Sequence, residues 1–189
     1  RMGLAHSPTK ARPTMQLILV TGLSGGGKSI AIRQLEDSGC YCVDNLPAEF
    51  LLPVAHRLGS LGEERDAVAI DGRSIATMKE VSESLAKLRE EGFDVRVLFL
   101  TASTDELIKR FSETRRRHPF SIRAEHEGKT LTLREAVELE AELLQPMAEH
   151  GMIMDTTGIL PAQLRRWVQQ FAGEPGARMT ITFESFAYK

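Results

Sequence analysis

One uninterrupted motif constrains this chain more than any other feature of its sequence. Residues 22–29, Gly-Leu-Ser-Gly-Gly-Gly-Lys-Ser, match the phosphate-binding loop pattern of a glycine, four free positions and then Gly-Lys-Ser. The apolar run Met15–Thr21 predicts a buried strand before the motif, and Ser29–Glu36 is typical of the first turns of a helix after it. A glycine-rich turn that binds nothing is the alternative, which a complete motif in this setting disfavours. We therefore expect a P-loop that binds a nucleotide.

Each part of the motif has a physical role toward a nucleotide. The glycines let backbone N–H groups turn toward a β-phosphate, and the helix that follows directs the positive end of its dipole at the same oxygens. Lys28 is expected to reach the β- and γ-phosphates as a catalytic residue, and the Ser29 hydroxyl to bind Mg²⁺ between them. The expected nucleotide-binding residues of the loop are Gly22, Leu23, Ser24, Gly25, Gly26, Gly27, Lys28 and Ser29.

Composition is consistent with one globular domain in a reducing setting. The 189 residues are 42% hydrophobic and 26% charged with a net charge of −2, so no global basic field attracts nucleic acid. Cys40 and Cys42 make neither a disulfide framework nor a four-ligand zinc site, and a cytoplasmic location is the simplest interpretation. No apolar run approaches the roughly 18 residues that span a bilayer, so we expect no membrane association.

Strand and helix patterns alternate along the chain after the motif. The expected strands are Tyr41–Val43, Ala67–Asp71, Val95–Leu100 and Met152–Met154, and the expected helices are Ala48–Leu58, Met78–Glu91, Thr104–Thr114, Leu133–His150 and Pro161–Phe171. Parallel neighbours need right-handed crossovers, so the alternation predicts a doubly wound, mostly parallel α/β sheet with helices on both faces. This is the nucleotide-kinase-like architecture of P-loop NTPases, in which ligands lie beyond the carboxyl ends of the strands.

Three segments follow from these patterns. Residues 1–14 lack periodicity and are expected to be a disordered natural extension or an expression remnant. Residues 15–172 are the expected P-loop nucleotide-binding domain. Residues 173–189 are expected to be a linker or strand that leads to a C-terminal domain outside this chain.

Two aspartates at strand ends are candidates for the chemistry of the site. Asp71 closes a buried strand, where P-loop proteins place the carboxylate that orients Mg²⁺, although a turn-capping aspartate is an equal alternative. Asp44, with Asn45, ends the strand after the P-loop helix, where a kinase receives the acceptor hydroxyl, and it is a candidate general base. An Asp-Asn-Leu-Pro turn that binds its own backbone is at least as good an explanation of Asp44. The turn Asp155–Thr157 is expected either to line the adenine pocket or to cap a helix.

A basic segment precedes a proline in the second half of the chain. Lys109–Arg117 contains five cations and one acid, and three consecutive arginines suit a lid whose catalytic Arg116 neutralises the transferred phosphate. A solvated helix end, where cations favour the negative dipole terminus, is the plainer alternative. A local RNA-phosphate patch is a third, which the nearby Glu125 and Glu127 disfavour.

The strings Asp-Asn-Leu-Pro at 44–47, Ile-Asp-Gly-Arg at 70–73, Ser-Glu-Thr-Arg-Arg-Arg-His-Pro at 112–119 and Phe-Glu-Ser-Phe at 183–186 give a more specific indication. Together with the P-loop, they resemble the bacterial RapZ/YvcJ family of P-loop nucleotide-binding proteins, over Met15–Lys189. The resemblance implies ATP and GTP binding with slow hydrolysis, a regulatory role, and in some members an adaptor function that presents RNA to a ribonuclease. It assigns ATP to the P-loop and a guanine nucleotide to Asp71, Gly72, Arg73 and Ser74.

We therefore expect an ATP- and GTP-binding regulatory protein with weak NTPase activity, in which Ser29 and Asp71 hold Mg²⁺. A small-molecule kinase that transfers the ATP γ-phosphate is the alternative. Partners that remain open are an RNA or a ribonuclease, reached through the full-length protein, and a second copy of the chain in a homo-oligomer.

Overall fold

A computed structural model describes residues 15–62, 65–70 and 77–173 of the chain. The strands are β1 (Gln16–Gly22), β2 (Tyr41–Leu46), β3 (Arg65–Ile70), β4 (Asp94–Thr101) and β5 (Met152–Asp155). The helices are α1 (Lys28–Asp37), the short 3₁₀ helix Ala48–Phe50, α2 (Leu51–Leu61), α3 (Thr77–Glu90), α4 (Thr104–Thr114), α5 (Pro119–His126), α6 (Leu133–Ala148) and α7 (Pro161–Gly173).

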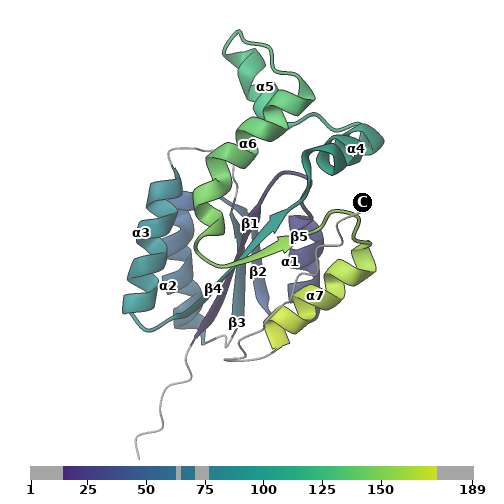
Figure 1. Ribbon diagram of the computed structural model, residues 1–189. Coiled ribbons are helices and arrows are strands. Elements are labelled where there is room, and N and C mark those ends of the chain that lie inside the picture. The colour runs from purple at the N-terminus through teal and green to yellow at the C-terminus, as the bar shows by residue number, and fades with distance from the viewer. Residues whose placement is uncertain (1–14, 63–64, 71–76, 174–189) are drawn as a thin grey trace, which may run out of the picture.

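The five strands form one parallel sheet in the order β2-β3-β1-β4-β5. Figure 1 shows α1 and α7 on one face of this sheet and α2, α3 and the end of α6 on the other. Helices α4 and α5 and the start of α6 lie beyond the carboxyl ends of the strands. The predicted doubly wound α/β architecture is confirmed.

The side-chain alternation of the central strand explains why both faces are covered. In β1, Leu17 and Leu19 pack into the apolar core under α2, α3 and α6. Ile18 and Val20 point the other way, into the core under α1 and α7. All four side chains are at most 1% exposed, so the strand is a continuous apolar run of the kind that parallel sheets need.

The first turn after β2 differs from the prediction of a single helix from Ala48. The chain forms a 3₁₀ turn over Ala48–Phe50 and becomes α-helical at Leu51. Pro53 lacks a backbone N–H and cannot donate to the carbonyl of Glu49 four residues earlier. The tighter 3₁₀ turn therefore precedes the regular helix.

The sequence patterns gave no expectation for α5, which begins at Pro119. Proline is favoured in the first turn of a helix, where its missing N–H has no intrahelical partner, and the His118 side chain accepts a hydrogen bond from the Phe120 N–H. By contrast, the start of α6 was predicted correctly, because Thr132 and Glu135 form a capping box.

Two glycines outside the P-loop provide a test of how the connection between α6 and β5 packs against β4. A Cβ on Gly151 would lie 2.1 Å from the Val97 carbonyl oxygen, whereas one on Gly173, at the end of α7, would meet no atom within 4 Å. Gly151→Ala should therefore lower the free energy of unfolding by about 1–3 kcal/mol, and Gly173→Ala should change it by no more than about 1 kcal/mol. Urea denaturation measures both values, and equal effects of the two substitutions would contradict this packing.

Candidate functional site

The P-loop forms a tight connection between β1 and α1 at the centre of the sheet. Its path requires glycine, because Gly22 has a φ of +133° and a Cβ there would lie 2.1 Å from the Leu100 carbonyl oxygen of β4. The same oxygen accepts a hydrogen bond of 2.9 Å from the Leu23 N–H. Gly27, the residue before α1, has a φ of +112°. These conformations turn the loop back over the carboxyl end of the sheet.

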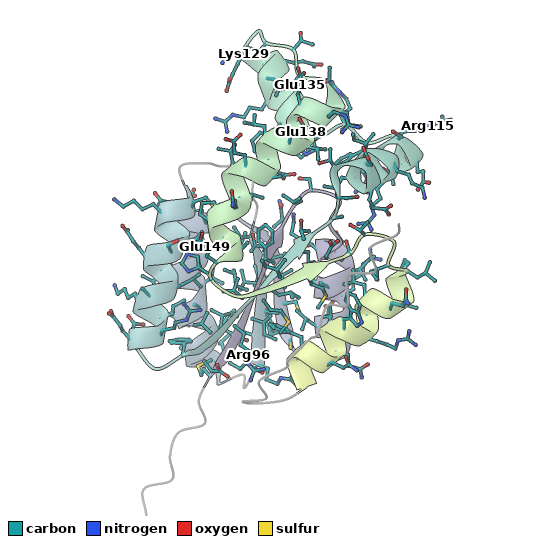
Figure 2. All side chains as sticks on the ribbon, viewed as in Figure 1. Arg96, Arg115, Lys129, Glu135, Glu138 and Glu149 are labelled. Atoms are coloured by element: carbon teal, nitrogen blue, oxygen red, sulfur yellow. The ribbon has the colours of Figure 1, made fainter. Side chains whose placement is uncertain are left out.

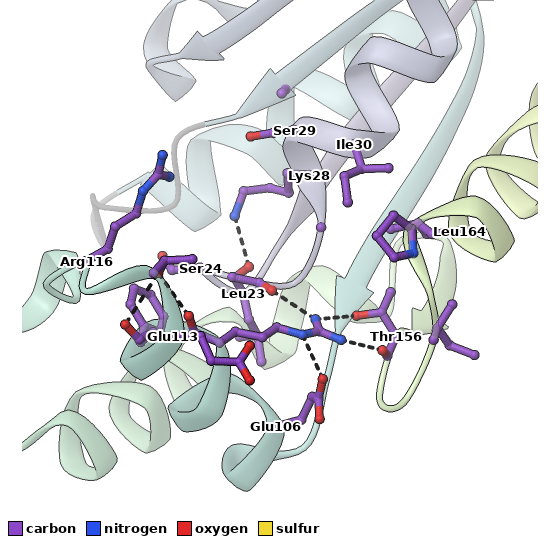
Figure 3. Close-up of a pocket in the computed structure, with 18 of the residues that line it drawn as sticks. Leu23, Ser24, Lys28, Ser29, Ile30, Glu106, Glu113, Arg116, Thr156 and Leu164 are labelled. Atoms are coloured by element: carbon purple, nitrogen blue, oxygen red, sulfur yellow. Dashed lines mark hydrogen bonds and ion pairs between the residues drawn. The ribbon is translucent and has the colours of Figure 1, made fainter.

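A cleft of about 890 Å³ opens along this loop. Its P-loop wall consists of Leu23, Ser24, Gly25, Gly27, Lys28 and Ser29. Of the predicted loop residues, Gly22 and Gly26 do not line the cleft, since both lie against Leu100. Figure 3 shows Lys28 and Ser29 at the start of α1, with Arg116 across the cleft.

The Lys28 ammonium lies over the first half of the loop. It donates hydrogen bonds of 2.7 Å to the Gly22 carbonyl and 3.2 Å to the Leu23 carbonyl. The lysine charge is thus held at the loop by backbone oxygens of the loop itself. Figure 3 shows the bond to Leu23.

Of the two predicted aspartates, the structure describes only Asp44. Asp44 lines the cleft together with Asn45. Strand β2 runs through both residues, with a register shift between Val43 and Leu46 and a φ of +56° at Asn45. Such a bulge redirects side chains, here toward the P-loop side of the sheet. Asp71, Gly72, Arg73 and Ser74 lie outside the described residues.

The basic segment borders the same cleft. Helix α4 ends at Thr114, and Arg115 takes up a left-handed conformation with a φ of +51°. Arg116 and Arg117 then line the cleft, and Arg117 pairs with Glu125 on α5. The helix-end explanation fits Arg115, whereas the next two arginines extend beyond the helix to the cleft.

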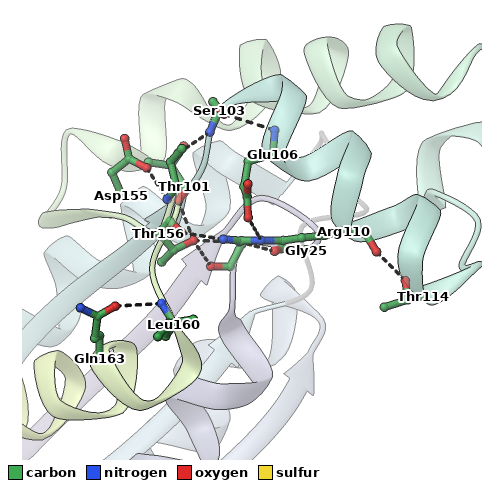
Figure 4. A network of polar contacts seen from close by, with 12 residues as sticks. Gly25, Thr101, Ser103, Glu106, Arg110, Thr114, Asp155, Thr156, Leu160 and Gln163 are labelled. Carbon is green, nitrogen blue, oxygen red and sulfur yellow. Dashed lines mark hydrogen bonds and ion pairs between the residues drawn. The ribbon is translucent and has the colours of Figure 1, made fainter. Parts of the chain in front are cut away.

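Arg110, which the sequence analysis did not single out, connects three walls of the cleft (Figure 4). Its guanidinium donates to the Gly25 carbonyl at 3.0 Å and to the hydroxyl and carbonyl oxygens of Thr156 at 2.9 and 2.5 Å. It also pairs with Glu106, one turn earlier on α4. Because Thr156 in turn donates to the Gly26 carbonyl at 2.9 Å, the loop after β5 is bound directly to the P-loop.

The turn after β5 forms one end of the cleft and does not cap a helix. Helix α7 begins only at Pro161, and Asp155 instead accepts a hydrogen bond from the Thr157 N–H. This end of the cleft is mostly apolar. Its lining residues beyond Thr156 are Ile159, Leu160, Pro161 and Leu164.

A buried carboxylate, also missed in the sequence, binds the P-loop from the far side. Glu140 on α6 is 2% exposed and accepts hydrogen bonds from the Ser24 N–H at 2.9 Å and the Ser24 hydroxyl at 2.7 Å. Its second neighbour is the buried His118, at 3.0 Å. The sequence does hold a signal, because Glu140 lies at helical spacing from the buried Val137 and Leu144.

The ionisation of Glu140 reflects opposing effects. Burial raises the pKa of this carboxyl, but hydrogen bonds from His118 and Ser24 and the nearby Lys28 charge together lower the pKa below the ordinary value of 4.5. Glu140 is therefore a carboxylate at neutral pH.

This lowered pKa predicts a pH dependence of stability. A carboxylate whose pKa is depressed by folding stabilises the protein above about pH 4.5, and this stabilisation is lost as pH falls through the folded-state pKa. The free energy of unfolding of the wild type should therefore fall more steeply than that of Glu140→Gln below about pH 4.5. Urea titrations of both proteins from pH 7 downward measure the difference, and parallel curves would contradict the assignment.

No described helix has the length and apolar content of a membrane span. Within residues 15–62, 65–70 and 77–173, no three His, Cys, Asp or Glu side chains gather as a metal-binding group.

Comparison with solved structures shows the fold. The chain is similar to a sugar kinase from Janibacter (TM-score 0.54, 18% identity, 84% of this chain and 94% of that one). It is also similar to shikimate kinase from Acinetobacter baumannii (TM-score 0.52, 15% identity, 87% and 96%). Both proteins are named as kinases, and at these identities the likeness concerns architecture alone.

Comparison of sequences shows the family. The chain is 47% identical over 178 residues to a protein of Burkholderia thailandensis named as a nucleotide-binding protein, covering 93% of this chain and 60% of the relative. A protein of the same description from Burkholderia pseudomallei is 48% identical, with the same coverage of this chain and of the relative. The chain thus spans about three-fifths of the length of these relatives. The model of the RapZ-like N-terminal domain matches residues 15–175, and the chain belongs to this family.

Proposed function

We propose that this chain is a regulatory nucleotide-binding domain that binds ATP or GTP with Mg²⁺ and hydrolyses it slowly. The observation that carries the proposal is the cleft itself, in which six residues of a complete P-loop motif, Lys28 among them, and three arginines meet an apolar end. Backbone donors at a helix start and fixed cations are what a triphosphate requires. The relatives' description as nucleotide-binding proteins supports the same conclusion.

The two ends of the cleft suit the two parts of a nucleotide. The triphosphate would lie along Gly25–Ser29, with its γ-phosphate toward Arg116. The base would then lie at the apolar end, between Arg110 and the residues Ile159–Leu164, where a planar guanidinium can contact its face. ATP is our first assignment for this pocket, and the guanine-nucleotide role of Asp71–Ser74 remains a proposal from the family resemblance.

Mg²⁺ fits the donor set of the loop. Mg²⁺ takes oxygen ligands, and Ser29 presents a hydroxyl oxygen to the cleft beside Lys28. Ser29 would hold the ion together with phosphate oxygens, and Asp71 is proposed to hold it through water. When bound, the ion would neutralise charge on the phosphates.

Slow hydrolysis is proposed because the sequence shows no obvious water-positioning glutamate beside Asp71, and the regulatory role is proposed from the family resemblance. Adaptor functions that involve RNA or a ribonuclease are proposed only for a protein of the relatives' full length, since a net charge of −2 gives this chain no general attraction to nucleic acid.

A small-molecule kinase is the second candidate, and Asp44 is the observation that favours it. Its carboxylate lines the same cleft as Lys28 and Arg116, so it faces the region where an acceptor would approach a γ-phosphate. In this case Asp44 would accept the proton of the acceptor hydroxyl.

Calorimetric titration tests nucleotide binding. ATP and GTP, each with Mg²⁺, should bind the wild type with micromolar affinity, and Lys28→Ala should weaken binding by roughly 10- to 100-fold, the value of a lost charged hydrogen bond. Lys79→Ala is the control, because this lysine is exposed on α3 and does not line the cleft. Equal binding by the two variants would remove Lys28 from the site.

The rate of hydrolysis separates a regulatory protein from an ordinary enzyme. We expect phosphate release under saturating Mg²⁺-ATP to be slower than about 1 per second. Release at or above that rate, lost in Lys28→Ala, would overturn the regulatory proposal.

Substitution of Asp44 separates the two candidates. A kinase would transfer phosphate stoichiometrically to a small molecule, and Asp44→Asn would abolish transfer while ATP affinity stayed unchanged. The regulatory proposal predicts instead that no small hydroxyl compound accepts phosphate at a rate above hydrolysis. Radiolabelled γ-phosphate, followed into product, decides between them.

A further inference from the structure

We infer that Glu140 is a positioning residue that fastens the P-loop to the arginine segment Arg110–His118, so that nucleotide binding and the helix pair α5–α6 are coupled. This inference rests on the proposed nucleotide-binding function and adds its regulation.

Three hydrogen-bond donors converge on the Glu140 carboxylate. Glu140 Oε2 accepts from the Ser24 N–H and from His118 Nε2, and Oε1 accepts from the Ser24 hydroxyl. Both Glu140 and His118 are almost fully buried, at 2% and 1% exposure. A surface contact would exchange with water, but a buried network of this kind fixes the relative position of its members.

The orientation of His118 follows from its hydrogen bonds. Its Nδ1 accepts a hydrogen bond of 3.1 Å from the Phe120 N–H, so the ring proton lies on Nε2 and is donated to Glu140. The ring also packs against the rings of Phe111 and Phe120, whose centroids are 5.0 and 5.7 Å away. One side chain therefore caps α5, contacts α4 and binds α6.

Both ends of the arginine segment Arg110–His118 are bound to adjacent residues of the P-loop. Arg110 donates to the Gly25 carbonyl, and His118 reaches Ser24 through Glu140. Arg116 and Arg117, which line the cleft, lie between these two attachments. A displacement of α5 and α6 must therefore move the loop, the arginines or both.

Coupling follows from this geometry by linkage. A nucleotide that fixes Gly25–Ser29 also restrains Ser24, and through Glu140 it restrains His118 and α5. If the nucleotide changes the binding free energy of a ligand that shifts α5–α6, that ligand must change the binding free energy of the nucleotide by the same amount. Figure 1 shows this helix pair extending beyond the sheet, where a partner can contact it.

A purely structural role for the buried network is the competing explanation, and three substitutions separate the two. Glu140→Gln removes the charge but keeps every bond, because the amide oxygen can accept from the Ser24 N–H and His118 while the amide N–H₂ donates to the Ser24 hydroxyl. His118→Asn keeps an acceptor for the Phe120 N–H, so α5 stays capped, but the shorter side chain does not reach Glu140. Glu140→Ala removes all three bonds.

Glu138→Ala is the matched control. Glu138 lies on the same helix two residues earlier, is about half exposed and pairs with Arg134 (Figure 2). Glu138→Ala removes the same charge from the helix as Glu140→Ala, but it removes no contact with the P-loop.

The experiment combines nucleotide titration with amide hydrogen exchange of α5 and α6, on the whole chain. In the wild type, Glu140→Gln and Glu138→Ala, Mg²⁺-ATP should slow exchange in residues 119–133 as well as in the loop. In His118→Asn and Glu140→Ala, nucleotide affinity should fall at least about fivefold, the lower end of coupling between linked sites, and protection of residues 119–133 should vanish.

The outcomes are distinct. Wild-type affinity and protection in His118→Asn, with its fold retained, would overturn the coupling while leaving nucleotide binding intact. Loss of affinity in Glu140→Gln equal to that in Glu140→Ala would overturn positioning by hydrogen bonds. Absence of ATP and GTP binding by the wild type would overturn the proposed function and the coupling with it.

Discussion

The close approach of the P-loop backbone to the end of β4 is the constraint on which the rest of the site depends. Gly22 and Gly26 lie against the Leu100 carbonyl so closely that a side chain on either would be within about 3 Å of it or nearer. The Leu23 N–H is bonded to the same oxygen. With the loop fixed at its base by the sheet, its remaining residues can be bound from the sides by α4, α6 and the turn after β5.

Both positively and negatively charged side chains surround this loop. Lys28 lies over the loop carbonyls, Arg110 crosses to Thr156, and Arg116 borders the cleft, while the buried Glu140 faces the loop from α6. A carboxylate near a phosphate site repels an anionic ligand and so weakens its binding. The three hydrogen bonds that it accepts offset this cost by holding the loop in one conformation, which fits the proposal that Glu140 positions the site.

The sequence predicted the architecture because local pattern and sheet packing agree. Continuous apolar runs such as Leu17–Val20 require cover on both faces, and the alternation with helices gives that cover through parallel crossovers. The loop motif was equally visible, since its residues are contiguous. Helix α5 was missed because only eight residues form it and its start depends on His118, whose orientation depends on Glu140.

The contacts that bind the loop from other elements could not be derived in this way. Arg110, Thr156 and Glu140 come from three separate elements, and their contacts with the loop span 85 or more positions along the chain. Only the sheet order β2-β3-β1-β4-β5 brings these elements together. Asp44 was predicted at a strand end, but the bulge that brings it to the cleft has no sequence signal.

The most direct test of the account is to locate the bound nucleotide by NMR. A ¹⁵N-labelled chain titrated with Mg²⁺ and a non-hydrolysable ATP analogue should show its largest shifts at the amides of Gly25, Gly27, Lys28 and Ser29, and at the Arg110 Nε–H. Shifts that avoid these groups and cluster elsewhere, or no shifts at millimolar ligand, would contradict the assignment of this cleft as the nucleotide site.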